Sequence, residues 1–438
     1  PSATSKSMSR PSGGTMLERD PDIFPKQDIL CIDCKSFFAS IECVERGLDP
    51  LTAKLCVVSR PHLKGGLVLA SSPRMKAEYG IGTGSRVYDL PKRDSDIVLA
   101  PARMNLYVQR NHDINRIFLQ YVAWEDLHVY SIDEAFLDVG RSHALFGSNY
   151  QIAWQIQHEI YKRYGLPTCV GIGDNLLLAK LCLDNVAKYR PPYLAYWSYA
   201  RIPETVWKIE KLSDFWGIGR RTQTALEAMG IYTVRDLAHA DLGKLKARFG
   251  VKGAELYYHA NGLDASVIRE AYSPQSQVYS ASQILERNYL DYRQVALVVR
   301  EMADNLASRL RREGRMTSCL GLGIGYGKDI VPKRSGGQMT FELTSSSKQL
   351  MAHSQTLLKR HYFRLPVKSL HLTVSHLQAA GPTQLSLFQD PEQSAQEERA
   401  ERVVDAVRER YGYGSLVRAS SLLPGATAIQ RADLIWGH

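Results

Sequence analysis

The sequence has no apolar stretch long enough to cross a membrane, and it shows no signal peptide. These absences predict a cytoplasmic protein that does not insert into membranes. Cysteine is also scarce, because the 438 residues contain only 7, at positions 31, 34, 43, 56, 169, 182 and 319. An odd number of cysteines in apolar runs fits a reducing compartment and argues against a disulfide framework.

Cys31 and Cys34 have the C-x-x-C spacing of some zinc sites, but no second pair of Cys or His follows at finger spacing. The run around them has a strand pattern, in which residues three apart face opposite sides. The sequence therefore does not favour a structural zinc site here.

The overall composition is that of a globular protein, with 44% hydrophobic and 23% charged residues, and the length predicts three or four domains. The formal net charge is +10, which favours polyanionic partners. This charge is uneven, because residues 277–380 hold 15 Lys or Arg against 7 Asp or Glu. We therefore expect this segment to face a nucleic acid.

Hydrophobic periodicity predicts an α+β architecture. Strand and helix patterns alternate as far as a buried strand at Thr168–Gly173, without the regular βαβ rhythm of a doubly wound sheet. Residues 212–262 are nearly all helical in pattern, and residues 277–378 follow the order βαββαβ, which predicts a four-stranded sheet backed by two helices. Residues 1–26, rich in Ser, Pro and Gly, are expected to be a disordered leader, and a charged helix is expected at 394–411.

Two adjacent carboxylates, Asp133 and Glu134, stand between apolar strand patterns at 127–130 and 134–139. Like charges repel and apolar neighbours disfavour ionisation, and a bound divalent cation relieves both problems. Asp33 ends another apolar strand pattern and can supply a third carboxylate. Carboxylates and a carbonyl on adjoining strands are what two Mg²⁺ ions need for phosphoryl transfer. The alternative is a solvated turn with ordinary surface acids.

The runs Ile32–Glu42 and Ser131–Asp138 resemble the two catalytic motifs of the Y-family DNA polymerases, the DinB/UmuC group that copies damaged templates. The similarity is closest to the bacterial UmuC-like branch, and it extends from residue 28 to residue 388 with at least five motifs in order. It implies low-fidelity translesion synthesis by two-metal-ion nucleotidyl transfer, with two Mg²⁺ ions for which Mn²⁺ can substitute. The substrates it implies are primer–template DNA and a dNTP.

The resemblance also implies a multidomain right-hand polymerase with palm, fingers and thumb, followed by a little finger domain that corresponds to the βαββαβ segment. The expected boundaries are the leader 1–26, the palm 27–47 and 101–195, the fingers 48–100, the thumb 196–262, a linker 263–276, the little finger 277–380 and a C-terminal tail 381–438.

Carried over to matching positions, Asp33, Asp133 and Glu134 become the catalytic metal ligands, with the backbone carbonyl of Cys34 as a further ligand. Phe38 occupies the position of a steric gate that rejects ribonucleotides by collision with the 2′-hydroxyl. Its neighbour Phe37 is expected to be core.

The resemblance assigns the triphosphate to the fingers and to a palm lysine. Ser71 and Lys188 match two of these positions, but the usual basic residue of the fingers corresponds to Ala77. Arg74 or Lys76 must then compensate, and we prefer Arg74. The alternative for both is a solvated helix face.

The run 215–222 joins two predicted helices and resembles the helix-hairpin-helix element of the family's thumb. Gly217 and Gly219 would let backbone N–H groups approach a DNA phosphate, and Arg220 and Arg221 would add charge.

The strand expected at 318–326 alternates large apolar residues with Gly321, Gly323 and Gly325, which would leave one face of the sheet bare for a DNA backbone. The alternative is that these glycines are merely tolerated in an ordinary sheet. Other outward positions on this face are expected to be Thr340, Thr344, His371, Thr373 and Ser375.

An apolar island in the polar tail resembles the pentapeptide that binds the bacterial sliding clamp, the β subunit. Its anchors are Gln384, Leu385, Leu387 and Phe388. The alternative is that this peptide folds back on its own domain. We expect the protein to be a monomer.

Two other functions remain open from the sequence. One is a catalytically silent accessory protein of the DNA damage response that binds DNA and the clamp. The other is a nuclease that uses the same metals, which is less favoured because the sequence offers no separate general base.

Overall fold

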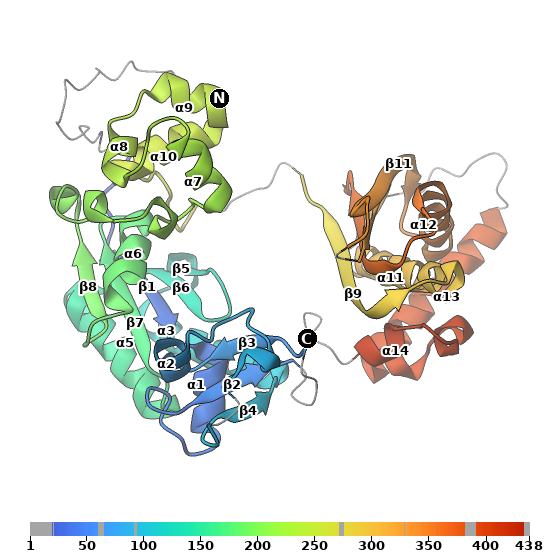
Figure 1. The fold of residues 1–438 in the computed structure, drawn as a ribbon, viewed down its shortest axis with the longest axis horizontal. Coiled ribbons are helices and arrows are strands. Elements are labelled where there is room, and N and C mark those ends of the chain that lie inside the picture. Colours follow the sequence, from blue (N-terminus) through green and yellow to red (C-terminus); the bar gives the residue numbers. More distant parts are fainter. Residues whose placement is uncertain are drawn as a thin grey trace. The chain divides into compact units, whose positions relative to one another are not determined.

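A computed structural model of the chain describes residues 20, 22–59, 65–91, 94–270, 276–327, 329–381 and 391–432, without the side chains of residues 391, 393 and 394. The chain divides into two compact units, Pro1–Ala271 and Tyr272–His438 (Figure 1). Within the described residues, no helix combines the length and the hydropathy that a membrane crossing requires.

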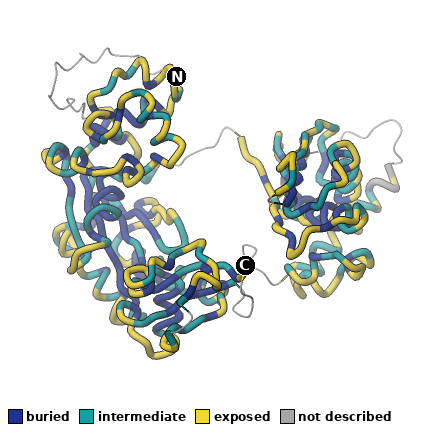
Figure 2. The backbone as a smooth tube through the Cα atoms, in the orientation of Figure 1, coloured by how far each residue is buried: buried dark blue, intermediate teal, exposed yellow. Residues whose placement is uncertain are grey.

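A five-stranded sheet forms the centre of the first unit, in the order β5-β6-β1-β7-β8. The middle strand β1 is antiparallel to β6 and β7, and its neighbours are buried almost throughout (Figure 2). The helix α5 packs against one face and α6 against the other. The elements are β1 (Ile29–Cys34), α3 (Met104–Tyr121), β5 (Leu127–Val129), β6 (Glu134–Asp138), α5 (Asn149–Tyr164), β7 (Thr168–Gly173), α6 (Leu176–Cys182) and β8 (Leu194–Trp197).

Two glycines of β7 allow α6 to approach the sheet closely. A Cβ on Gly171 would lie 2.2 Å from the carbonyl oxygen of Ala179, and one on Gly173 would lie 2.1 Å from the amide nitrogen of the same residue. Any side chain there would push the helix away from the sheet. The helix continues into a π-helical turn, Leu183–Ala187.

The expected fingers region contains a three-stranded sheet with its own small core. Its order is β3-β2-β4, and the parallel pair of β2 with β4 closes the sheet. The elements are β2 (Leu55–Val58), β3 (Val68–Ser71), α2 (Pro73–Tyr79) and β4 (Val98–Pro101). Helix α1 (Phe37–Val44), from the expected palm segment, contacts β2 and β3.

The helical prediction for residues 212–262 is confirmed. Four helices lie there, α7 (Arg220–Glu227), α8 (Val234–Ala238), α9 (Leu242–Phe249) and α10 (Val251–Ala260). The segment after them was expected to be a linker over 263–276, but its described part is attached to the first unit. The Asp264 carboxylate accepts the Leu177 N–H, and Arg269 forms an ion pair with the buried Asp126.

The second unit has the predicted βαββαβ order and a sheet in the order β11-β10-β12-β9. Large residues of β10 enter the core under the helices, whereas the glycines of the same strand face the other way. The elements are β9 (Tyr279–Tyr289), α11 (Tyr292–Arg312), β10 (Arg315–Tyr326), β11 (Arg334–Thr344), α12 (Ser347–His361), β12 (Val367–Ser375) and β13 (Gln378–Ala379).

Thr344 does not lie on the outward face, contrary to our expectation. It is buried at the end of β11, and its hydroxyl accepts the N–H of Ser346 just before α12. Thr340 and His371 are exposed, as expected.

We expected a tail after residue 381, but residues 391–432 pack on α11 as part of the second unit. The charged helix is α13 (Pro391–Tyr411), followed by the short α14 (Ala428–Arg431). Arg311 of α11 pairs with Glu401, and the Glu301 carboxylate accepts the N–H groups of Thr427 and Ala428. The proposed clamp peptide at 384–388 lies outside the described residues.

Candidate active site

The three predicted acids come together at one end of the central sheet. In the antiparallel pair of β1 and β6, Asp33 lies directly opposite Glu134. Residues opposite each other in such a pair project from the same face, so these two carboxylates are neighbours. The N–H of Cys34 donates to the Asp133 carbonyl over 2.9 Å, which brings the third acid to the same place.

The turn before β6 is held by Ser131. Its hydroxyl donates to Oδ1 of Asp133 over 2.6 Å and accepts the N–H of Glu134 over 3.1 Å. These bonds fix the orientation of the acidic pair where the hairpin turns.

The helix α6 and its π-helical turn bring two lysines to the acids. Lys188 Nζ lies 3.1 Å from Oδ2 of Asp33, and Lys180 Nζ lies 2.7 Å from Oε2 of Glu134. Asp184 lies between the lysines, 3.1 Å from Lys180 and 3.0 Å from Lys188. Sequence reasoning had found Lys188 but had missed Lys180 and Asp184. Their i, i+4, i+8 spacing is the signal that could have found them.

Burial raises the pKa of Asp33 to about 6, against the opposing effect of Lys188 and with a further rise from Asp133. Closely spaced, partly desolvated carboxylates of this kind are stabilised in the ionised form by a divalent cation. Hard oxygen ligands suit Mg²⁺. Among the described residues, no three Asp, Glu, His or Cys side chains are arranged so that they could hold a metal ion as they stand. Asp33 and Glu134 are instead paired with lysines.

Cys34 is buried, and burial raises the pKa of its thiol well above the usual value. A thiol that resists ionisation is a poor metal ligand, which leaves the backbone carbonyl as the group of interest at this position. All seven cysteines are buried and free.

The two phenylalanines that open α1 differ in exposure. Phe37 is 2% exposed and belongs to the core. Phe38 is half-buried and stacks on Tyr107, with ring centroids 4.4 Å apart and an angle of 15° between the rings. The Tyr107 hydroxyl donates to the buried Glu42 carboxylate, so the second ring supports a fixed wall beside Phe38.

The fingers residues do not lie where we expected. Ser71 is fully buried, and its hydroxyl donates to the Ile81 carbonyl over 2.6 Å. Arg74 faces away from the acids and pairs with Glu78 at 2.6 Å. Lys76, two positions along the helix and therefore on another side of it, donates to the Ser36 hydroxyl over 2.9 Å.

The pKa of Lys76 reports its surroundings. Burial lowers this pKa, Asp33 opposes the decrease, and Lys188 adds to it. Lys76 therefore shares the electrostatic environment of the acidic centre, whereas Arg74 does not. The geometry favours Lys76 over Arg74 and Ser71 as the fingers group that faces the site.

A cavity of about 1130 Å³ extends from Asp184 and Lys188 to the hairpin before α7. Its lining includes Asp184, Lys188, Trp216, Gly217 and Gly219. Gly217 has a φ of +91°, which an L side chain would strain, and Gly219 precedes the first turn of α7. Arg220 and Arg221 follow and are exposed.

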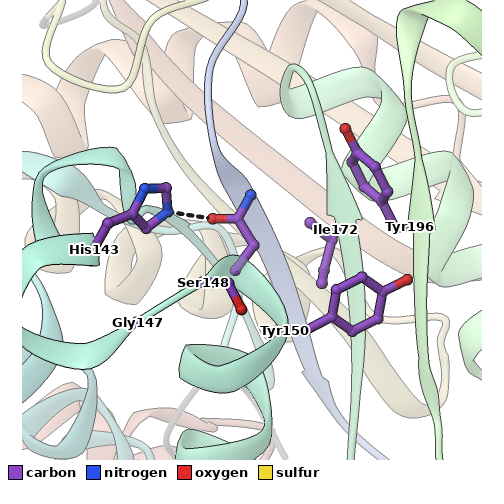
Figure 3. Close-up of a pocket in the computed structure, with 7 residues that line it drawn as sticks. His143, Gly147, Ser148, Tyr150, Ile172 and Tyr196 are labelled. Carbon is purple, nitrogen blue, oxygen red and sulfur yellow. Dashed lines mark hydrogen bonds between the residues drawn. The ribbon is translucent and has the colours of Figure 1, made fainter.

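A second cavity, of about 510 Å³, lies near the start of α5 and contains none of the predicted site residues. Figure 3 shows Tyr150 and Tyr196 side by side in it. The His143 ring also forms a hydrogen bond of 2.6 Å with Asn149. It is separate from the acidic centre in composition, since its lining holds no carboxylate.

Comparison with known proteins agrees with this arrangement. Residues 32–184 match the impB/mucB/samB family, residues 276–387 match the C-terminal domain of that family, and residues 213–264 match the thumb domain of DNA polymerase iota. Among solved structures, the Y-family DNA polymerase chimera Dbh-Dpo4(243-245)-Dbh shares the fold, with a TM-score of 0.64 and 18% sequence identity over 80% of this chain and 99% of that one.

Two relatives from Bacillus subtilis match almost end to end. A protein named for UV-damage repair, UvrX, is 37% identical over 95% of this chain and 98% of its own length. A protein named DNA polymerase IV 2 is 30% identical over 94% of this chain and 98% of its own length. The α+β prediction is confirmed, and the chain belongs to the impB/mucB/samB family of Y-family translesion DNA polymerases.

Proposed function

We propose that this chain adds nucleotides to a primer opposite damaged template bases, with Asp33, Asp133 and Glu134 as its catalytic acids. The observation that carries the proposal is the register of β1 on β6, which sets Asp33 opposite Glu134. Lys188, which pairs with Asp33, lines a cavity that continues to the glycine hairpin, and this supports a phosphate-binding surface beside the proposed site.

Enzymes of this family depend on divalent metal. The carboxylates of Asp33, Asp133 and Glu134 and the carbonyl of Cys34 would hold two Mg²⁺ ions, for which Mn²⁺ can substitute. When bound, the ions supply positive charge to the reacting phosphate and to the attacking oxygen. The hard oxygen donors and the partly desolvated Asp33 fit such a pair.

The triphosphate of the incoming nucleotide needs additional cations from the protein. Lys188 supplies one from the palm, and Lys76 supplies one from the fingers in place of the Arg74 and Ser71 that we first preferred. Phe38, supported by Tyr107, blocks a 2′-hydroxyl by collision and so selects deoxyribonucleotides.

The DNA is held by its backbone. The N–H groups at Gly217 and Gly219 and the charges of Arg220 and Arg221 bind phosphate near the first unit's cavity. On the second unit, the glycine face of β10 allows a close approach of a sugar–phosphate backbone. Binding of this kind is independent of sequence and weakens as salt rises.

Primer extension on a template with an abasic site tests the function. The purified chain with Mg²⁺ and dNTPs is expected to extend the primer past the lesion. Binding to the same DNA without extension would support the catalytically silent accessory protein, and a shortened primer would support the nuclease. Either result would overturn the proposal.

The clamp assignment is tested separately. We propose that the peptide Gln384–Phe388 binds the sliding clamp, with Leu385 and Leu387 as further anchors. The peptide would tether the polymerase, which we propose is a monomer, to the clamp. Changing Leu387 and Phe388 to Ala should end the retention of the chain on immobilised β clamp. Extension on short templates without clamp should be unchanged, because none of the proposed site residues belongs to this peptide.

A further inference from the structure

Three charged residues along α6 and the π-helical turn after it form a row, which we call the ladder, next to the proposed catalytic acids. Lys180, Asp184 and Lys188 follow at intervals of four, and Asp184 contacts both ammonium groups within 3.1 Å. In a regular α-helix, residues eight apart are rotated by about 80° relative to one another. The π-helical turn Leu183–Ala187 adds an extra residue to the local turn and brings Lys188 back to the side of Lys180.

The ladder is buried at Lys180 and partly exposed at Asp184 and Lys188, and hydrogen bonds hold both ends. The side chains of Lys180 and Glu134 are each 8% exposed, and the second carboxylate oxygen of Glu134 accepts the Cys31 thiol over 3.3 Å. The Lys35 ammonium donates to the Lys188 carbonyl over 2.6 Å and so fixes the end of the ladder. Burial by itself lowers the pKa of Lys180, but its hydrogen bond to Glu134 and the charges of Glu134 and Asp184 outweigh this effect, so that lysine stays charged.

We propose that Lys180 and Lys188 act as counter-cations of Glu134 and Asp33 in the metal-free enzyme. Asp184 is then a positioning residue, which holds both lysines when the two carboxylates bind metal ions instead. The inference rests on the proposed metal role of Asp33 and Glu134. It goes beyond that role, because Lys180 and Asp184 need touch neither substrate nor metal.

The proposal follows from the alternation of charge. Glu134, Lys180, Asp184, Lys188 and Asp33 alternate in sign along a chain of contacts from 2.7 to 3.1 Å. Without lysine partners, two adjacent buried carboxylates would repel each other. Without Asp184, a lysine that leaves its carboxylate has no other anion within reach among these contacts, so it would compete more strongly with the incoming metal.

The two residues should therefore affect metal binding in opposite directions. Lys180→Met removes a competing positive charge, and we expect it to tighten binding of Mn²⁺ alone by about tenfold. Asp184→Asn removes a nearby negative charge and frees the lysines for Asp33 and Glu134, so we expect it to weaken Mn²⁺ binding by about tenfold. The double variant should lie near the wild type. The measurement is electron paramagnetic resonance of free Mn²⁺ titrated with the full chain.

Controls separate charge from folding. Asp184→Glu keeps the charge and should restore most of the affinity, whereas Asp113→Asn, which removes a carboxylate outside the site on α3, should leave it unchanged. If Lys180→Met does not fold, as judged by circular dichroism, the Asp184 variants alone decide. Weakening by Asn with recovery by Glu supports the proposal, and any other pattern overturns it.

The kinetics of dNTP incorporation provide a second measurement, which a purely structural role of Asp184 would not change selectively. Because Asp184 retains Lys188 for the triphosphate, Asp184→Asn should raise the KM for dNTP by about tenfold and lower kcat by less. A loss confined to kcat would overturn the proposal. A shift of the Mn²⁺ affinity in the same direction in both single variants would also overturn the proposal.

The outcomes also distinguish this inference from the proposed function. If the wild type fails to bind Mn²⁺, the metal role of Asp33 and Glu134 is wrong and the inference falls with it. If the wild type binds Mn²⁺ and the two variants do not diverge, only the inference is wrong.

Discussion

Carboxylates that are buried or partly buried in the two units of this molecule are neutralised by different cations. In the first unit, Asp33 and Glu134 are paired with lysines. In the second unit, Asp304 is 3% exposed and accepts hydrogen bonds from Arg408 and Arg418, each at 3.0 Å. The first pair belongs to the proposed catalytic centre, and Asp304 joins α11 to Arg408 and Arg418.

The two kinds of cation differ in chemistry, and the two sites also differ in burial and in neighbouring carboxylates. Arginine presents a rigid, permanently charged fork that several acceptors can share, whereas lysine is a single flexible charge. Burial alone would raise the pKa of Asp304, but Arg418 and Arg408 outweigh it and hold this pKa below its ordinary value. The pKa of Asp33 is raised instead. Two arginines thus outweigh the effect of burial on the pKa of Asp304, whereas Lys188 does not outweigh it at Asp33, where Asp133 adds to the rise.

The largest effect should come from the catalytic group. Glu134→Ala should reduce primer extension by on the order of 1,000-fold or more, because it removes a ligand of the ions that stabilise the transferring phosphate. Primer–template binding, measured by fluorescence anisotropy, should survive. Retained extension would show that this acid is no more essential to the reaction than Asp304.

The structural group should behave in the reverse way. Asp304→Ala leaves Arg408 buried without its partner, and we expect it to lower the free energy of unfolding of the second unit by about 2–4 kcal/mol. Urea denaturation measures this change. Arg418→Ala is a milder control, because that side chain is 45% exposed. Equal stability of Asp304→Ala and wild type would contradict a locking role.

The contrast between a residue of the proposed site and a residue of the core can also be tested within α1. Phe38→Ala should reduce the discrimination against ribonucleotides by about 10- to 100-fold, as judged by the ratio of kcat/KM for dNTP and rNTP. Phe37→Ala is the matched control, since it should cost about 3–5 kcal/mol of stability and leave sugar selectivity unchanged. If both variants lose only stability, Phe38 is not the gate.

A fall in pH should change the contributions of Asp33 and Asp304 to stability in opposite directions. The folded-state pKa of Asp33 lies above its ordinary value, so ionisation of this group costs stability above pH about 6, and protonation relieves that cost as pH falls. Mn²⁺ binding should therefore weaken below pH about 6, since protons compete for the carboxylate. Asp304 has a lowered pKa, so its contribution to stability is present above the unfolded-state pKa and is lost as pH falls through the folded value.

This prediction is checked by Mn²⁺ titrations and urea denaturation between pH 4 and 8. Asp33→Asn should remove the pH dependence of stability that arises near pH 6. An unchanged profile in that variant would assign the dependence to another group.

The sequence determined the secondary structure wherever periodicity was strong. β7 lies at Thr168–Gly173 with the predicted bounds, and the second unit has the predicted βαββαβ order. The alternation of large residues with glycine in β10 also predicted which side chains enter the core. The acidic residues Asp133 and Glu134 stood out because paired carboxylates between apolar strands are costly without a cation.

Only the tertiary structure decided which side chains reach the site. Arg74 and Lys76 are equivalent in the sequence, but α2 turns Lys76 toward the acids and Arg74 toward Glu78. The spacing of Lys180 and Asp184 puts them on one helix face, but they reach the acids only because Gly171 and Gly173 let α6 approach the strands. Local spacing sets the face of a helix or strand, whereas contacts between segments distant along the chain depend on how the elements pack, and short-range patterns carry no record of that packing.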